Sequence, residues 1–250
     1  MSSVQGLSPA LIIIVGAVAV PLLRAGYRNW YMLTLPFAAF AVLLLTPDGE
    51  HGAMRLLGFE LVTVRIDGWS RLFSYVFLLA TALSIIYAWH LRDWVQQVAG
   101  LVYAGSAVGA VLAGDLLTLF FYWEGTALSS VLLIWASRTQ ASYRAGARYL
   151  VIQILSGLLL FAGAAVLYTQ TGSIRFEHIG LEGVAGWLIF VAFGIKCAFP
   201  LMHNWLQDAY PQATVTGTVF LSAFTTKLAV YALARGYAGT PELIWIGAVM

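Results

Sequence analysis

The chain consists largely of long apolar runs, separated by short segments that carry most of its charged residues. A helix needs roughly 20 apolar residues to cross the hydrocarbon core of a bilayer, and in lipid only helices and closed barrels satisfy the backbone. Eight runs are near this length and a ninth begins near residue 243. They cover about 7–23, 30–45, 70–90, 95–113, 116–136, 147–169, 184–206 and 214–235. The sequence therefore predicts an all-α, polytopic membrane helix bundle.

Composition agrees with this class and excludes several others. Hydrophobic residues make up 61% of the chain and charged residues 10%, and the net charge of +2 is too small and scattered to favour nucleic acid. The single cysteine, Cys197, excludes an intrachain disulfide and a cysteine-based metal site. No nucleotide, flavin, quinone or metal motif is evident, so no cofactor is expected. Any redox chemistry would belong to partner subunits.

The charged loops predict an orientation. Two arginines follow the first run, one follows the third and three follow the fifth, which places them all on one side: Arg24, Arg28, Arg92, Arg138, Arg144 and Arg148. The opposite short loops carry mainly Arg175 and Arg235, so the positive-inside rule places the N-terminus outside the cytoplasm. The first run lacks the basic flank and cleavage site of a signal peptide and is expected to remain as a span. Alternation along 59–66 predicts an external hairpin within residues 46–69.

Three charged residues lie deep inside apolar runs, where a charge costs at least a few kcal/mol and usually has a function. Glu124 lies eight residues into its run, roughly 12 Å into the bilayer core at 1.5 Å per residue. A carboxylate at that depth becomes neutral unless a cation lies beside it. The alternative is a purely structural role, as an ion pair or a hydrogen-bonded neutral acid.

Lys196 and Lys227 are the only lysines, and each lies far inside a run. Pro200 follows Lys196 by four residues, so its ring and missing N–H predict a kink or break at the lysine that could admit water. His203 lies two turns beyond Lys196 and is a candidate relay, although a residue that satisfies backbone groups at a helix end is the alternative. Lys227 shares a helix side with Thr216 and Tyr231. For Lys227 the alternative is a lysine held by carbonyls for packing alone.

At this point the motifs resemble a known family. They are Gly114-Asp115-Leu116-Leu117-Thr118-Leu119-Phe120, Glu124, Lys196 followed by Phe199-Pro200-Leu201-Met202-His203-Asn204-Trp205, and Phe220-Leu221-Ser222-Ala223-Phe224 before Lys227. This resembles the antiporter-like, proton-translocating subunits shared by respiratory complex I, membrane-bound hydrogenases and multisubunit Na+/H+ antiporters of the Mrp type. The resemblance runs from about residue 60 to 239. Within the family the chain is similar to the D subunit of Mrp-type antiporters and to complex I subunits N, M and L.

The resemblance implies a fold of about fourteen helices, in which helices four to eight and nine to thirteen form two inverted repeats. Residues 1–94 would hold helices one to three, 95–239 the first proton-translocating repeat, and 240–250 the start of helix nine, where the chain looks truncated. The family's buried residues fall on Glu124, on Lys196 in a discontinuous seventh helix, and on Lys227 in the eighth. The implied location is the bacterial cytoplasmic (inner) membrane, with other membrane subunits as partners and H+ and Na+ as ions.

The predicted mechanism is a switchable pair of Glu124 and Lys196. The carboxylate stabilises the ammonium when the two are paired, and burial favours release of the proton when they separate. Water at the Pro200 break, with His203, would pass the proton to Lys227. Two other classes remain open: a secondary transporter of a small anionic solute with the lysines as counter-ions, and a structural membrane subunit that carries no ion.

Overall fold

The apolar runs form helices, and nearly all of the ends lie within a few residues of the predicted ones. The computed structural model describes residues 8–56 and 58–250, so Leu7, where the first predicted span begins, lies outside them. The helices are α1 (Pro9–Ala19), α2 (Ala25–Leu45), α3 (Gly68–Tyr87), α4 (Trp94–Leu112), α5 (Leu116–Trp135), α6 (Gln140–Thr171), α7 (Gly183–Cys197), α8 (Asn204–Ala209), α9 (Val215–Gly236) and α10 (Pro241–Val249), with 3-10 turns η1 (Val20–Leu22) and η2 (Tyr210–Gln212). The six that are long and apolar enough to cross a membrane are α2, α3, α4, α5, α6 and α9. The predicted polytopic helix bundle is confirmed.

Short polar side chains fix where several helices begin. The Asp67 carboxylate accepts a hydrogen bond from the Ser70 N–H, and the Asp115 carboxylate accepts one from the Thr118 N–H. Both aspartates therefore satisfy N–H groups that the first helical turn leaves without a partner. In α9 the Thr214 hydroxyl plays the same part. Near lipid, a helix end without such a cap would leave backbone N–H groups unsatisfied, because no water is present to accept their hydrogen bonds.

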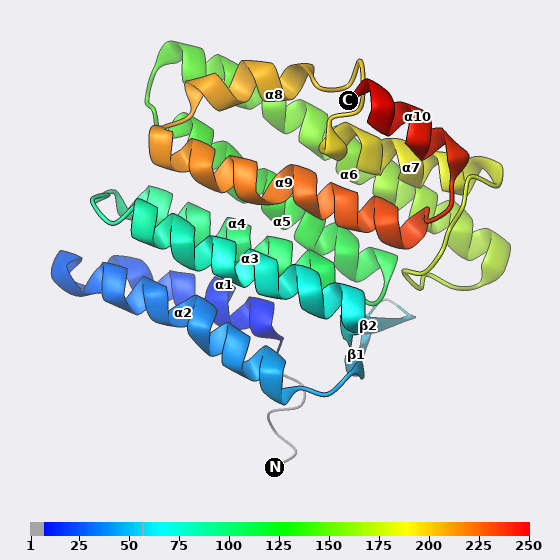
Figure 1. Cartoon of the computed structure of the whole chain (residues 1–250), viewed down its shortest axis with the longest axis horizontal. Helices are drawn as coiled ribbons and strands as arrows, with labels where there is room; N and C mark the ends of the chain where they lie inside the picture. The colour runs from blue at the N-terminus through cyan, green and yellow to red at the C-terminus, as the bar shows by residue number, and fades with distance from the viewer. Residues whose placement is uncertain (1–7, 57) are drawn as a thin grey trace.

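Helix α4 lies at the centre of the bundle, with α1, α3, α5 and α9 packed around it (Figure 1). Two of its glycines, Gly105 and Gly109, permit this close packing. A Cβ on Gly105 would meet Ala10, Ile13 and Ile14 of α1, and one on Gly109 would meet the Tyr122 ring of α5. Small residues let helices approach closely in a membrane. Gly105 and Gly109 therefore serve two different neighbouring helices.

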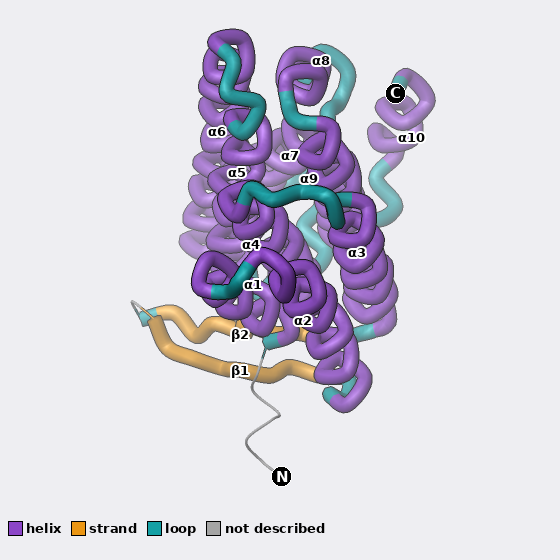
Figure 2. The backbone as a smooth tube through the Cα atoms, turned by 90° about the vertical axis from the view of Figure 1, so that its left-hand side faces the viewer, coloured by secondary structure: helices purple, strands orange, loops and turns teal. Residues whose placement is uncertain are grey.

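A two-stranded antiparallel hairpin lies across one end of the bundle (Figures 1 and 2). Strand β1 (Gly49–Leu56) pairs with β2 (Phe59–Ile66), from Gly49 opposite Ile66 to Leu56 opposite Phe59. Val62 ties the hairpin to the α4–α5 junction, because its N–H donates to the Asp115 carboxylate (2.8 Å) and its carbonyl accepts from the Gly114 N–H (3.0 Å). A side chain on Gly114 would collide with Val62. Asp115 therefore serves both the helix and the hairpin.

The predicted break near Lys196 is present and interrupts the helix completely. Helix α7 ends at Cys197, and two residues that follow adopt left-handed backbone, Ala198 (φ 65°) and Leu201 (φ 69°). The single predicted span 184–206 is thus wrong in its second part, because the helix stops at Cys197 and the chain continues through a loop, α8 and η2. The Trp205 indole donates to the Ile195 carbonyl in the last turn of α7 (2.9 Å), which also accepts from the Ala198 N–H (3.1 Å).

The short helix α8 is held against α6 by an ion pair. The Arg148 guanidinium binds both oxygens of the Asp208 carboxylate, each at 2.7 Å. These charge-assisted hydrogen bonds hold the pKa of Asp208 below its usual range. The returning segment after the break is therefore anchored to the neighbouring helix.

Candidate functional site

Lys196 is completely buried at the last turn of α7, and its ammonium contacts only neutral groups. The Nζ atom donates to the Trp123 carbonyl (2.9 Å) and to the Thr126 hydroxyl (2.7 Å), both in α5. It also lies 4.4 Å from the centroid of the Trp123 ring, close enough for a cation–π interaction. These contacts stabilise an ammonium, but they bring no negative charge. The site can therefore hold a proton without fixing it in an ion pair.

Glu124 lies beside this site but is not paired with the lysine. None of the ion pairs among residues 8–56 and 58–250 joins the Glu124 carboxylate to Lys196. The Glu124 side chain lies against Gly157 of α6, and its buried Oε1 atom has no hydrogen-bond partner within the described residues. In the structure the Glu124 carboxylate and the Lys196 ammonium therefore lie apart, without an ion pair between them.

Two sets of hydrogen bonds join the helices around Lys196. The Ser156 hydroxyl donates to the Ala192 carbonyl of α7 (2.7 Å) and accepts from the Trp123 indole of α5 (3.0 Å). Further along, the Ser130 and Tyr149 hydroxyls of α5 and α6 lie 2.7 Å apart. These contacts fix the register of α5, α6 and α7. The indole N–H of Trp123 is thereby held by Ser156, while the Trp123 carbonyl and ring contact the Lys196 ammonium.

Gln153 of α6 lies between these two sets of bonds. It is 0% exposed, and within the described part of the chain neither its amide oxygen nor its amide nitrogen has a hydrogen-bond partner. The sequence carries a signal for it, since it is the one amide within the apolar run 147–169. It was not among the residues predicted from the sequence. Trp123 and Thr126 were also missed, because residues of these types are common in membrane helices.

His203 does not lie on a continuous helix with Lys196, so the predicted spacing of two helical turns between them is wrong. The helix that carries the lysine ends at Cys197, and His203 follows the break at the start of α8. Its side chain is half-buried and makes no capping hydrogen bond to α8. The alternative role as a helix cap through its side chain is therefore not seen.

Lys227 occupies a different environment from Lys196. Its side chain is exposed on α9, and its Nζ atom donates to the Ser222 carbonyl (2.8 Å), five residues earlier. Thr216 and Tyr231, which share its side of the helix, are 5% and 1% exposed. The structure thus separates the two lysines into one enclosed site and one that faces outward from the bundle.

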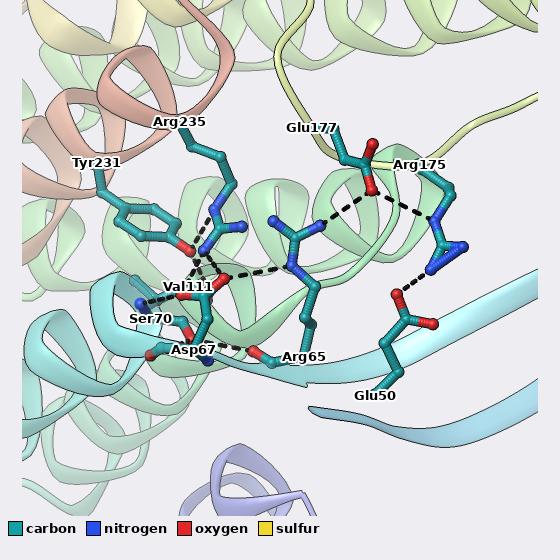
Figure 3. A network of polar contacts seen from close by, with 9 residues as sticks. All are labelled: Glu50, Arg65, Asp67, Ser70, Val111, Arg175, Glu177, Tyr231 and Arg235. Carbon is teal, nitrogen blue, oxygen red and sulfur yellow. Dashed lines mark hydrogen bonds and ion pairs between the residues drawn. The ribbon is translucent and has the colours of Figure 1, made fainter. Parts of the chain in front are cut away.

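A second polar cluster lies at the hairpin end, away from Lys196 (Figure 3). Arg235 of α9 donates to both Asp67 oxygens (2.8 and 2.7 Å) and to the Tyr231 hydroxyl (2.8 Å). From Asp67 the chain of ion pairs continues through the side chains of Arg65, Glu177, Arg175 and Glu50. It borders a cavity of about 500 Å³. With three arginines and three carboxylates, the cluster balances its charge and joins β1, β2, α3, α9 and the loop before α7.

No group of three or more His, Cys, Asp or Glu residues in the described ranges is arranged to hold a metal ion. The polar groups near Lys196 are instead a carboxylate, hydroxyls and an amide. Such groups exchange and relay protons. The chemistry that this arrangement supports is proton binding and release inside a membrane protein.

Comparison with known proteins places the chain in a family. Residues 113–243, just over half of the 250, match the family model described as NADH:quinone oxidoreductase/Mrp antiporter, TM. The matched region contains Glu124, Gln153, Lys196, His203 and Lys227. The protein is a multi-pass membrane protein, and the chain belongs to this family.

Curated relatives come from both branches of the family. The A subunit of a Na(+)/H(+) antiporter from Alkalihalophilus pseudofirmus is 28% identical over 92% of this chain and 32% of its own length. The NADH-quinone oxidoreductase subunit M from Rhodobacter capsulatus is 26% identical over 84% of this chain and 48% of its own. The chain thus spans about a third to a half of these relatives. Their names do not support the predicted likeness to the D subunit.

Solved structures agree at the level of fold. A chain of respiratory complex I from Thermus thermophilus has a TM-score of 0.80 at 23% identity, covering 96% of this chain and 56% of its own length. A chain of the Mrp complex from a Dietzia species has a TM-score of 0.76 at 24% identity, covering 100% of this chain and 52% of its own. The fold is therefore that of the antiporter-like membrane subunits, with a discontinuous seventh helix.

Proposed function

We propose that this chain is a proton-translocating membrane subunit of a multisubunit cation/proton antiporter or complex I-like assembly. The observation that carries the proposal is Lys196, fully buried beside a helix break and held by neutral groups alone. A lysine in such a place is costly for structure, because an apolar side chain would pack there without losing hydration. Its value lies in binding and releasing a proton.

The Glu124 carboxylate acts as the switch. Beside the ammonium it would stabilise the charge, whereas in the separated arrangement of the structure burial favours the neutral amine. Cycling between the two arrangements loads and unloads Lys196. Gly157 permits this, since only a residue without a side chain leaves room for the Glu124 carboxylate against α6.

The break after Cys197 and the residues beyond it supply the route. The opened backbone between 198 and 203 offers polar groups where water can enter, and half-buried His203 lies at the end of this segment. Lys227, exposed on α9, is the receiving group toward a neighbouring protein segment. An ammonium facing lipid at this depth would be costly, so another membrane subunit or a further part of the antiporter-like fold covers it.

The proposed location is the bacterial inner membrane, with the N-terminus outside the cytoplasm. The proposed substrate is H+. Na+, which the names of the antiporter relatives contain, is the first exchanged cation to test.

The test uses Lys196→Ala and Glu124→Ala in the complete assembly that contains this chain, with proton flux followed by a pH-sensitive dye in membrane vesicles. Both variants are expected to abolish proton-coupled transport and leave the assembly intact. Arg144→Ala is the matched control, since Arg144 is an exposed cation outside the site. Loss of assembly without a specific transport defect would contradict the proposal. Uptake of a labelled anionic solute that persists in both variants would also contradict the proposal. That result would favour the alternative of a solute transporter.

A further inference from the structure

Gln153 is a buried amide whose hydrogen-bonding groups are satisfied by no protein atom among the residues that the structure describes. It carries two N–H donors and a carbonyl acceptor, and neither its nitrogen nor its oxygen has a partner there. Leaving such a group unsatisfied costs about 1–3 kcal/mol. A leucine would fill the same space without that penalty. The position of Gln153 beside ionisable groups gives a reason for its presence.

The hydrogen bonds between helices place Gln153 at the depth of Lys196. Helices α6 and α7 are antiparallel, because Gly163 lies against Ala185 and Ile189 whereas Ser156 bonds to the Ala192 carbonyl. From this bond, Gln153 lies three residues back along α6, about 4.5 Å, and Lys196 lies four residues on along α7, about 6 Å. Because the helices are antiparallel, both displacements run in the same direction through the bundle, so Gln153 and Lys196 lie at a similar depth.

Glu124 lies one helical turn from the same amide. The carboxylate rests on Gly157, four residues after Gln153, so the two positions lie on one face of α6 about 6 Å apart in depth. Ser156, which contacts both α5 and α7, lies beside them on this face. Gln153 is therefore directed between the helix that carries Glu124 and the helix that carries Lys196. The buried Oε1 atom of Glu124, like the Gln153 amide, has no partner within the described residues.

We propose that Gln153 holds bridging water between Glu124 and Lys196 and so acts as a positioning residue for proton transfer between them. A buried water needs two to four polar partners, and the amide, the carboxylate and the ammonium supply them. The amide donates and accepts, so it orients the water without taking up the proton. In the step, a proton leaves the Glu124 carboxylic acid, passes through the water and binds the neutral Lys196 amine. The products are the carboxylate and the ammonium, and Lys196 is then loaded for release toward Lys227.

This inference rests on the proposed proton-translocating function. Its test replaces the amide with apolar side chains of similar size, in Gln153→Leu and Gln153→Met. The control is Gln170→Leu, an exposed position on the same helix. Proton flux of the complete assembly is measured in vesicles, together with thermal stability and the infrared carboxyl band of Glu124, assigned with Glu124→Gln.

We expect both Gln153 variants to lower proton flux by about tenfold or more, because proton transfer depends steeply on alignment of donor and acceptor. Thermal stability should stay unchanged or rise, since no hydrogen bond to protein is lost. The Glu124 band should shift, and Gln170→Leu should change none of the three.

Two results would overturn the inference while leaving the proposed function standing. One is normal flux in the Gln153 variants alongside loss of flux in Lys196→Ala. The other is a failure of both Gln153 variants to assemble, which would assign the amide to packing. If Lys196→Ala and Glu124→Ala are also silent, the proposed function itself fails.

Discussion

At the residue scale, the Lys196 site depends on one tryptophan used in three ways. The Trp123 carbonyl accepts from the ammonium, its ring faces the ammonium, and its indole N–H binds Ser156. The hydrogen bond from the indole N–H to Ser156 fixes the orientation of the ring that faces the ammonium. Since none of these groups carries a charge, the charge near Lys196 can be changed by moving a single side chain, Glu124.

That movement requires room on α6, and Gly157→Ala is expected to remove it. An added Cβ would collide with the Glu124 carboxyl group, which must then leave its place. We expect loss of most proton flux with normal assembly, measured in membrane vesicles. Gly26→Ala is the control, because nothing lies within 4 Å of a Cβ at that helical position. Normal flux in Gly157→Ala would mean that the resting place of Glu124 does not matter for transport.

The sequence reveals some of these residues and not others. Glu124 and Lys196 are identified by their charge, because a charged residue in an apolar run is rare. Thr126 and Trp123 are not, since their importance comes from which side of α5 faces the end of α7. That relation depends on packing between segments about 70 residues apart. Gln153 is intermediate, as its polarity is visible in the sequence but its lack of partners among the described residues is not.

At the element scale, the break of the seventh helix is produced by more than its proline. Pro200 prevents the helix from continuing, and the interruption also includes left-handed backbone at Ala198 and Leu201. Such backbone costs an L-residue about 1–2 kcal/mol, and glycine adopts it freely. The discontinuity is therefore maintained against local strain by the contacts of α8.

Ala198→Gly is expected to stabilise the protein. It relieves the left-handed strain, and the gain exceeds the greater flexibility of glycine in the unfolded chain, for a net gain of about 0.5–1 kcal/mol. The midpoint of thermal unfolding of the purified assembly should rise by about 1–3 °C. The control is Ala165→Gly, at an exposed position inside α6, which should lower stability by about 1 kcal/mol. Opposite signs for the two variants test the conformation directly.

The hairpin end offers a comparison of a shielded and an exposed arginine. The Arg235 side chain is 9% exposed and joins α9 to the first turn of α3 through Asp67, whereas the Arg55–Glu60 pair is 79% and 75% exposed. We expect Arg235→Gln to cost about 2–4 kcal/mol and Arg55→Gln less than about 1 kcal/mol. Thermal unfolding of the assembly measures both. Equal effects would show that the Asp67 contact does not hold α9 in place.

At the scale of the whole molecule, the sequence predicts the spans well because lipid imposes a local requirement. Each apolar run must form its own backbone hydrogen bonds, so composition alone locates most helices, and short polar caps such as Asp115 mark their starts. The central position of α4, the ion-pair cluster at the hairpin end and the exposure of Lys227 depend on contacts between distant segments. No single run encodes them.

Orientation in the membrane is a property of the whole molecule that the charged ends predict. The turns after α1, α3 and α5 lie at the end of the bundle opposite the hairpin, and the six arginines at Arg24, Arg28, Arg92, Arg138, Arg144 and Arg148 belong to this end. The positive-inside rule predicts that this end faces the cytoplasm and the hairpin faces outward. Helix α8 runs from the break toward this end, because its Asp208 pairs with Arg148, so the proposed proton path from the break would open toward the cytoplasm.

Single cysteines test this orientation, because Cys197 is the one native cysteine and Cys197→Ala removes it. Gln140→Cys lies at the arginine-rich end and Glu182→Cys at the hairpin end, and both positions are exposed. A membrane-impermeant maleimide added to intact cells should label Glu182→Cys, and Gln140→Cys should react only after the membrane is opened. The cysteine-free chain controls for background labelling. The reverse pattern would invert the orientation and place α8 on the outer side, so that the proposed proton path from the α7 break would open outside the cell.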